Sequence, residues 1–106
     1  MFYDFLLHTT TKEQTKNSIG QAIDVVRPHK AFYGDLQPVS QSVTDSINNA
    51  LGGDRIDIMY NLFTDEEISL GDVVIYNEQT FLVYKLNKCY DYTQAIIIKR
   101  EYERAI

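Results

Sequence analysis

The chain has 106 residues, of which 44% are hydrophobic and 24% are charged, and its formal net charge is −5. This length supports one domain with one hydrophobic core, and the composition is that of a globular protein rather than a disordered one. The negative charge argues against a generic nucleic-acid binder, which needs a basic field to neutralise phosphates. With Cys89 as the single cysteine, no intramolecular disulfide can form. No stretch resembles a signal peptide or a membrane span, so we expect an intracellular protein.

Residues 1–18 are expected to form an N-terminal strand or arm followed by a polar loop. Met1–His8 is largely apolar, which is typical of a short strand or of an arm that docks on something. Thr9–Ser18 is polar and has no apolar periodicity, which predicts a mobile loop or linker. Residues 19–106 are then expected to form a single β-rich domain.

Two short strands are predicted next, separated by a proline. Ile19–Val26 alternates imperfectly, and Pro28 is expected to end this strand because proline cannot donate a ladder hydrogen bond. Lys30–Gln37 resumes as a strand, and Gly34 inside it indicates a bulge or bend. Two strands that meet at a proline corner favour a small, bent sheet or barrel.

One amphipathic helix is predicted, over about residues 41–51. Its apolar positions follow a 3.6-residue period on one face: Val43, Ile47, Ala50 and Leu51. Ser40 and Ser42 are both suitable N-caps, and Gly52-Gly53 supplies a left-handed C-terminal stop.

The second half of the chain is predicted to be antiparallel sheet. Asp54–Thr64 alternates as a strand with one buried face, and Asp65-Glu66-Glu67 follows as an exposed acidic turn. Gly71–Arg100 contains three β-branched and aromatic runs joined by turn residues, which predicts a meander of strands over 73–76, 81–86 and 95–100. The expected fold class is therefore α+β, mainly antiparallel β, with a small β-barrel-like sheet and one helix.

Catalytic, cofactor and metal residues are not expected. His8 and His29 have no Cys or carboxylate at metal-ligand spacing, and Cys89 has no histidine placed to activate it. The acidic turn lacks the pattern of a calcium loop, and the glycine turns lack the lysine of a phosphate-binding loop. We therefore expect a protein that is not an enzyme.

The tyrosines are the remaining functional candidates. Tyr76 and Tyr84 are interpreted as a cross-strand pair that packs the meander, and Tyr90 and Tyr92 as partner contacts in the loop between its last two strands. Tyrosines on a small barrel can also stack nucleotide bases, but the net charge favours contact with protein.

Several turns and strands resemble those of the head-completion, or head–tail connector, proteins of long-tailed bacteriophages, the family that includes the stopper. The matching segments are Tyr33–Pro38, Gly71–Tyr76, Phe81–Val83, Tyr90–Tyr92 and the closing Lys99-Arg100. Asn77–Thr80 departs from the family, in which a glycine is common at this turn. Cys89-Tyr90 stands where a tryptophan is usual.

The resemblance implies a structural virion protein of the head–tail junction, made in the host cytoplasm. It would self-associate into a ring, contact portal or adaptor and tail proteins, and touch DNA at most non-specifically in the channel. The implied contact residues lie in two loops: Asp65, Glu66, Glu67, Lys88, Tyr90, Asp91 and Tyr92. An acidic lining would repel DNA and let it slide. Two alternatives stay open: a tail terminator or minor capsid or neck component, and an unrelated small-barrel module that binds nucleic acid or protein.

Overall fold

The computed structural model describes residues 3–16 and 18–104. The expected N-terminal arm, polar loop and tail also include Met1, Phe2, Asn17, Ala105 and Ile106, which lie outside the described residues. The described residues form seven strands and one helix: β1 (Phe5–Lys16), β2 (Ala22–Pro38), α1 (Gln41–Leu51), β3 (Met59–Thr64), β4 (Val73–Tyr76), β5 (Gln79–Lys88), β6 (Thr93–Lys99) and β7 (Glu103–Arg104).

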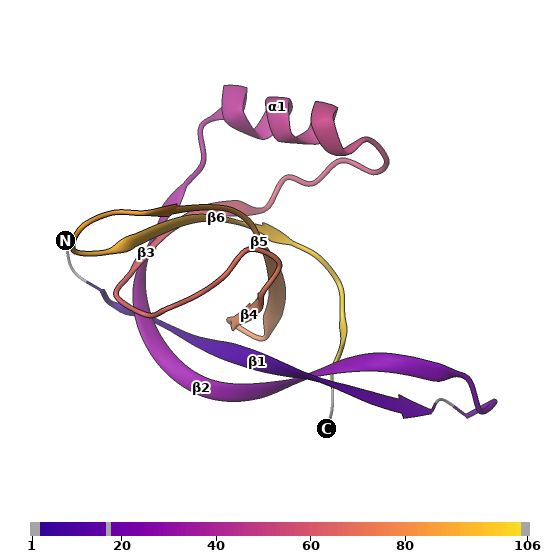
Figure 1. Cartoon of the computed structure of the whole chain (residues 1–106). Helices are drawn as coiled ribbons and strands as arrows, with labels where there is room; N and C mark the ends of the chain where they lie inside the picture. The colour runs from indigo at the N-terminus through magenta and orange to yellow at the C-terminus, as the bar shows by residue number, and fades with distance from the viewer. Residues whose placement is uncertain (1–2, 17, 105–106) are drawn as a thin grey trace.

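Six of the strands form a sheet that closes on itself. The hydrogen-bonded order is β1-β4-β5-β6-β3-β2, and β2 pairs with β1 again, so that the strands surround a central space in Figure 1. Every pair in this ring is antiparallel, and β7 adds to β2 from outside as a short parallel strand. The structure confirms the predicted fold class and the meander, which corresponds to β4, β5 and β6.

The main core fills the inside of this ring. Its members alternate along the strands with outward residues, as a one-sided sheet requires, and the most deeply buried are Leu7, Leu62, Val74, Phe81, Val83 and Ile97. The rings of Phe5, Tyr76, Tyr60 and Phe81 contact one another in series, with centroids 5.7 to 6.1 Å apart. Burial of these apolar surfaces is the principal stabilising term for the closed sheet.

The helix covers a second, smaller apolar cluster on the outer face of the sheet. Ile47 packs with Met59 and Ile98, and all three are buried. The helix occupies Gln41–Leu51, as predicted, and its N-cap is Ser40, whose side chain accepts a hydrogen bond from the Val43 amide at 3.4 Å.

The segment expected to be a polar loop is instead half of a long hairpin. Thr10–Lys16 of β1 pairs with residues 22–28 of β2, and this part of the hairpin projects from the ring in Figure 1. We call it the arm. The prediction failed because residues 11–16 are exposed on both faces, so that the strand carries no apolar alternation.

Pro28 does not end a strand, contrary to the prediction. β2 runs through it without interruption, and Pro28 lies opposite Thr10, where the pairing register with β1 shifts. Such irregularities are the places at which a sheet tolerates proline.

Two further predictions are corrected. Residues 54–58 are not strand, and β3 begins at Met59, which packs under the helix while Tyr60 and Leu62 belong to the inner core. Both faces of β3 are therefore partly buried. Tyr76 and Tyr84 are not a cross-strand pair, because Tyr76 lies opposite Gln79 and packs inside the ring, whereas Tyr84 packs with the helix cluster.

Candidate partner-contact surface

Two loops that are distant in the sequence meet at one side of the closed sheet. The β3–β4 loop starts after Thr64, which pairs with Thr93, and Thr93 in turn pairs with Lys88 at the end of β5. This register places the acidic turn beside the β5–β6 loop. The Lys88 Nζ lies 4.0 Å from the Glu67 Oε1 and joins the two loops directly.

The three acidic residues of the β3–β4 loop occupy different environments. Asp65 accepts a hydrogen bond from the Tyr3 hydroxyl at 3.3 Å, and Glu66 accepts one from Lys30 Nζ at 3.0 Å. The side chain of Glu66 is 22% exposed, whereas that of Glu67 is 94% exposed. The predicted exposed acidic turn is therefore correct for Asp65 and Glu67, and Glu66 is half-covered.

Ile68 holds this loop against the body of the protein. Its side chain is 2% exposed and belongs to the inner core, although the residue lies outside any strand. The loop thus passes across the closed sheet in Figure 1. An apolar anchor of this kind fixes the acidic residues just before it in space.

The β5–β6 loop presents the aromatic part of the surface. The Cys89 amide donates to the Tyr92 carbonyl at 2.8 Å, which closes the hairpin and leaves Tyr90 fully exposed at its tip. The ring of Tyr92 lies against Phe63, with centroids 6.1 Å apart. Hydrogen bonding with the Cys89 side chain raises the pKa of Tyr92 above its ordinary value.

Sequence reasoning missed three aromatic residues that complete this side of the molecule. Tyr33 is 59% exposed, lies opposite Leu6 across the β1–β2 ladder, and its carbonyl accepts a hydrogen bond from Thr64 Oγ1. Tyr3 and Phe63 contact the predicted residues through Asp65 and Tyr92. Of these three, only Tyr33 could have been recognised from the sequence as an exposed residue. Side chains alternate along a strand, so Tyr33 faces outward if its neighbours Phe32 and Gly34 face inward.

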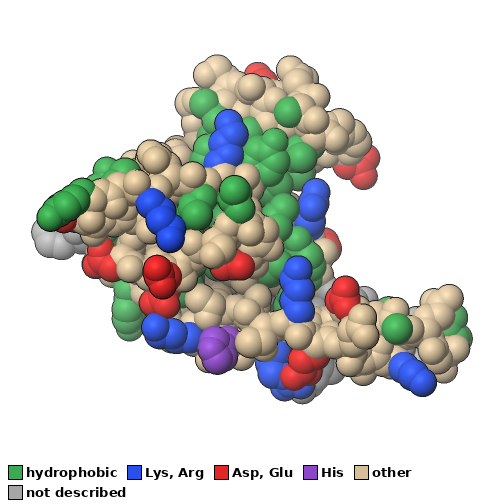
Figure 2. Space-filling view, viewed as in Figure 1, with side chains coloured by type: hydrophobic (Ala, Val, Ile, Leu, Met, Phe, Trp, Pro, Cys, Tyr) green, Lys and Arg blue, Asp and Glu red, His purple; other side chains and the backbone are tan. Residues whose placement is uncertain are grey.

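We call this region the loop surface: residues 65–67 and 88–92, together with Tyr3, Tyr33 and Phe63. All seven predicted contact residues fall within it, so the structure brings together two loops that the sequence could name but not join. Apolar and acidic side chains lie side by side at the left of Figure 2, on the side opposite the arm. Burial, followed by the neighbouring Asp65 carboxylate, raises the pKa of Tyr3.

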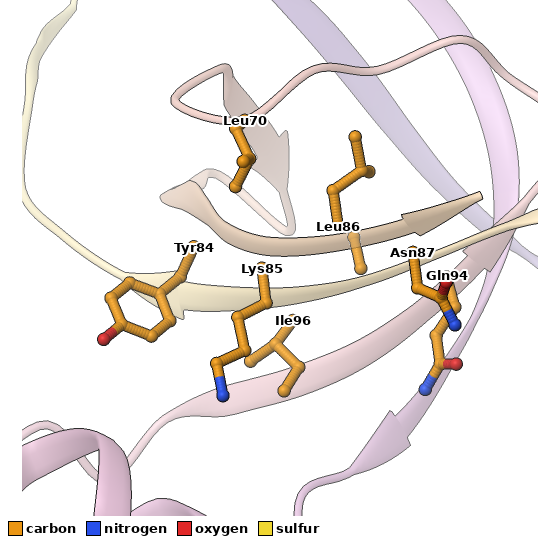
Figure 3. Close-up of a pocket in the computed structure, with 8 residues that line it drawn as sticks. Leu70, Tyr84, Lys85, Leu86, Asn87, Gln94 and Ile96 are labelled. Carbon is orange, nitrogen blue, oxygen red and sulfur yellow. The ribbon is translucent and has the colours of Figure 1, made fainter.

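A separate groove of about 440 Å³ is lined by Leu70 and by residues of β5 and β6. Its lining is drawn in Figure 3, where Tyr84, Lys85 and Ile96 extend from the strands on one side of the groove. The pairing register between β5 and β6 shifts between Val83 and Lys85, which adds one residue to β5 at this point. No titratable pair or hydrogen-bonded cluster converges in the groove among the residues that line it.

The chemistry of the described residues offers no metal centre. Across residues 3–16 and 18–104, no group of three or more His, Cys, Asp or Glu side chains is placed to hold a metal ion. Cys89 is a free, half-buried thiol. In the same residues, no helix is long and apolar enough to cross a membrane.

No protein-family model matches the chain, and no curated protein matches it.

Proposed function

We propose that the protein is a structural, non-catalytic subunit of a bacteriophage virion, located at the head–tail junction. It closes the portal channel as a member of a ring and offers a docking surface to the tail. The proposal starts from the resemblance of residues 30–100 to head-completion proteins, and it is supported by the shape of the molecule. Two different contact features, the arm and the loop surface, lie on opposite sides of one closed sheet (Figure 1).

The arm is the observation that carries the proposal. A compact domain of this length has a radius of gyration of about 13 Å, whereas the Cα value here is 14.6 Å and the longest extent is 46 Å. The outer arm, which we define as residues 14–16 and 18–24, is a two-stranded ribbon of mainly polar, exposed residues, and such ribbons are only marginally stable in water. It therefore contributes little to the stability of its own subunit, and its reach suits contact with a neighbour.

The placement of the arm suits a ring. An arm that docks on the body of its neighbour, and not on the neighbour's own arm, makes a head-to-tail contact, because the two subunits contribute different surfaces. Head-to-tail contacts between identical subunits close into rings when the rotation between neighbours permits. We accordingly assign the arm to the neighbouring subunit and the loop surface to the portal, adaptor or tail proteins.

The test removes the outer arm without disturbing the body. In the variant, a two-residue Asn-Gly turn replaces residues 14–24 and connects Glu13 to Val25. These two residues pair across the hairpin, so a tight turn can join them. The native protein should sediment with purified portal or adaptor rings, and the arm-less variant should remain folded but lose ring assembly. A Glu13→Gln variant, which keeps the arm and loses only its ion pair with Arg27, serves as the matched control.

Other outcomes would assign a different function. Sedimentation with tail tubes alone would make the protein a tail terminator or a related neck component. Binding to nucleic acid with a steep salt dependence, and no association with portal rings, would make it a small-barrel binding module.

A further inference from the structure

We propose that the loop surface binds a protein segment that presents arginine side chains, whose guanidinium groups stack on exposed tyrosine rings and donate hydrogen bonds to the aspartates. The inference rests on the proposed function only in taking the loop surface as a protein-contact surface. It adds the chemistry of the partner, which neither the resemblance nor the fold assigns.

The first argument is charge. Five carboxylates lie on or beside the loop surface, against the two lysines Lys30 and Lys88: Asp35, Asp65, Glu66, Glu67 and Asp91. The two lysines already face glutamates, since Lys30 pairs with Glu66 and Lys88 approaches Glu67. Within residues 3–16 and 18–104, the three aspartates form no ion pair. The surface is therefore negative, and a partner that docks on it must bring positive charge.

The second argument is that each of these aspartates either hydrogen-bonds a tyrosine or lies within two residues of one in the chain. The Tyr3 hydroxyl donates to Asp65. Tyr33 and Asp35 are two residues apart on β2, so they share its outer face. Tyr90 precedes Asp91 in the β5–β6 loop. The loop surface and its border thus hold one tyrosine–aspartate hydrogen bond and two tyrosines that lie near an aspartate in the chain.

The third argument is the exposure of the rings. Tyr33 is 59% exposed and Tyr90 is fully exposed, so both can offer a ring face to a ligand. The ring of Tyr92 contacts that of Phe63, with centroids 6.1 Å apart. Exposed, positioned aromatic rings are typical of protein contact surfaces.

Arginine fits this arrangement better than lysine does. The planar guanidinium stacks on an aromatic face and donates two parallel hydrogen bonds to a carboxylate, whereas an ammonium is a strongly hydrated point charge. Nucleic acid is disfavoured because phosphates would approach carboxylates. An uncharged apolar segment would desolvate the aspartates without bringing a positive charge to them.

The experiment titrates the isotope-labelled, full-length protein with three peptides of the same length and spacing. One carries three arginines in a Gly-Ser background, the second carries lysines at those positions, and the third carries citrulline, which keeps the shape and removes the charge. Amide chemical shifts report where each peptide binds. We expect the arginine peptide to change the amide chemical shifts of residues 65–67, 88–92 and the end of β2. The lysine peptide should bind about two- to fivefold more weakly. The citrulline peptide should produce no saturable change in chemical shift.

Two variants sharpen the test. Tyr33→Ser combined with Tyr90→Ser should reduce the preference for arginine over lysine, because it removes two rings on which a guanidinium can stack. Both side chains are exposed, so the fold should be left intact. Asp54→Asn, an exposed carboxylate in the turn that follows the helix, is the matched control and should bind as the native protein does.

Equal affinity for the arginine and lysine peptides, no binding of either, or shifts centred on the helix or the arm would each overturn the inference. Failure of the proposed function reads differently. If portal, adaptor and tail assemblies all fail to bind while the arginine peptide still binds at the loop surface, the head–tail assignment is wrong and the partner chemistry stands. If portal rings bind and the arginine peptide does not, the head–tail assignment stands and the proposed partner chemistry is wrong.

Discussion

A Cβ atom added to Gly34 would lie 2.6 Å from the Cδ1 of Leu62 and 3.1 Å from the Phe63 carbonyl oxygen. Gly34 pairs with Thr64 in the β2–β3 ladder and has no shift in register, so it marks a close approach between two strands rather than the bulge or bend that the sequence suggested.

Gly34→Ala should therefore destabilise the protein by about 1–3 kcal/mol, because Leu62 is fully buried and cannot move aside freely. Chemical denaturation measures the loss. Combining it with Leu62→Ala, which removes the clashing atom, should cost less than the sum of the two single substitutions. Strict additivity would show that the close contact does not determine the identity of this residue.

The loop surface should depend on one buried side chain beside it. Ile68→Ala should lower the free energy of unfolding by about 2–5 kcal/mol, because it leaves a cavity in the inner core. The neighbouring Leu70→Ala is the control, since Leu70 is 63% exposed and should change stability by no more than about 0.5 kcal/mol. Similar losses for the two variants would contradict the role of Ile68 as the anchor of the loop.

Substitution of Ser40 and Ser42 can test which of the two serines caps the helix, since the sequence left both as candidates. Ser40→Ala should cost about 1 kcal/mol, because its side chain accepts the hydrogen bond from the Val43 amide. Ser42→Ala removes a hydroxyl of the same size from the first turn and should have a smaller effect. Thermal unfolding followed by circular dichroism compares them, and a larger loss for Ser42→Ala would place the cap there instead.

The arm should show a defined response to acid. Arg27 donates to both carboxylate oxygens of Glu13, at 3.0 and 3.1 Å, and this hydrogen bonding, followed by the charge attraction, lowers the pKa of Glu13. Because the pKa is lowered in the folded protein, the contribution of the pair is present above the ordinary glutamate pKa and is lost as the pH falls through the lowered value.

NMR titration of the Glu13 carboxyl group measures this pKa directly. We expect the native midpoint to lie below that of an Arg27→Gln variant, in which the donor charge is gone. Both side chains are well exposed, so the effect on global stability should be small. Coincident titration curves would mean that the ion pair does not form in solution.

Local patterns were sufficient for some elements and insufficient for others. The helix could be predicted at about its observed bounds and β4 at its observed bounds, because capping, periodicity and turn glycines act within a few positions of one another. The arm was missed for the opposite reason. Its first strand is hydrogen-bonded but has no buried side chain over residues 11–16, so the order of polar and apolar residues there shows no alternation.

By itself, the sequence determined the fold class, the helix, the meander and the two loops that carry the predicted contact residues. Only the tertiary structure decided that these loops meet, that Tyr3, Tyr33 and Phe63 join them, and that Tyr76 faces the core while Tyr84 faces the helix. The physical reason is register. Which residues stand side by side in a closed sheet depends on how strands pair around the whole ring, and that pairing is set by the packing of the shared core, which no local pattern encodes.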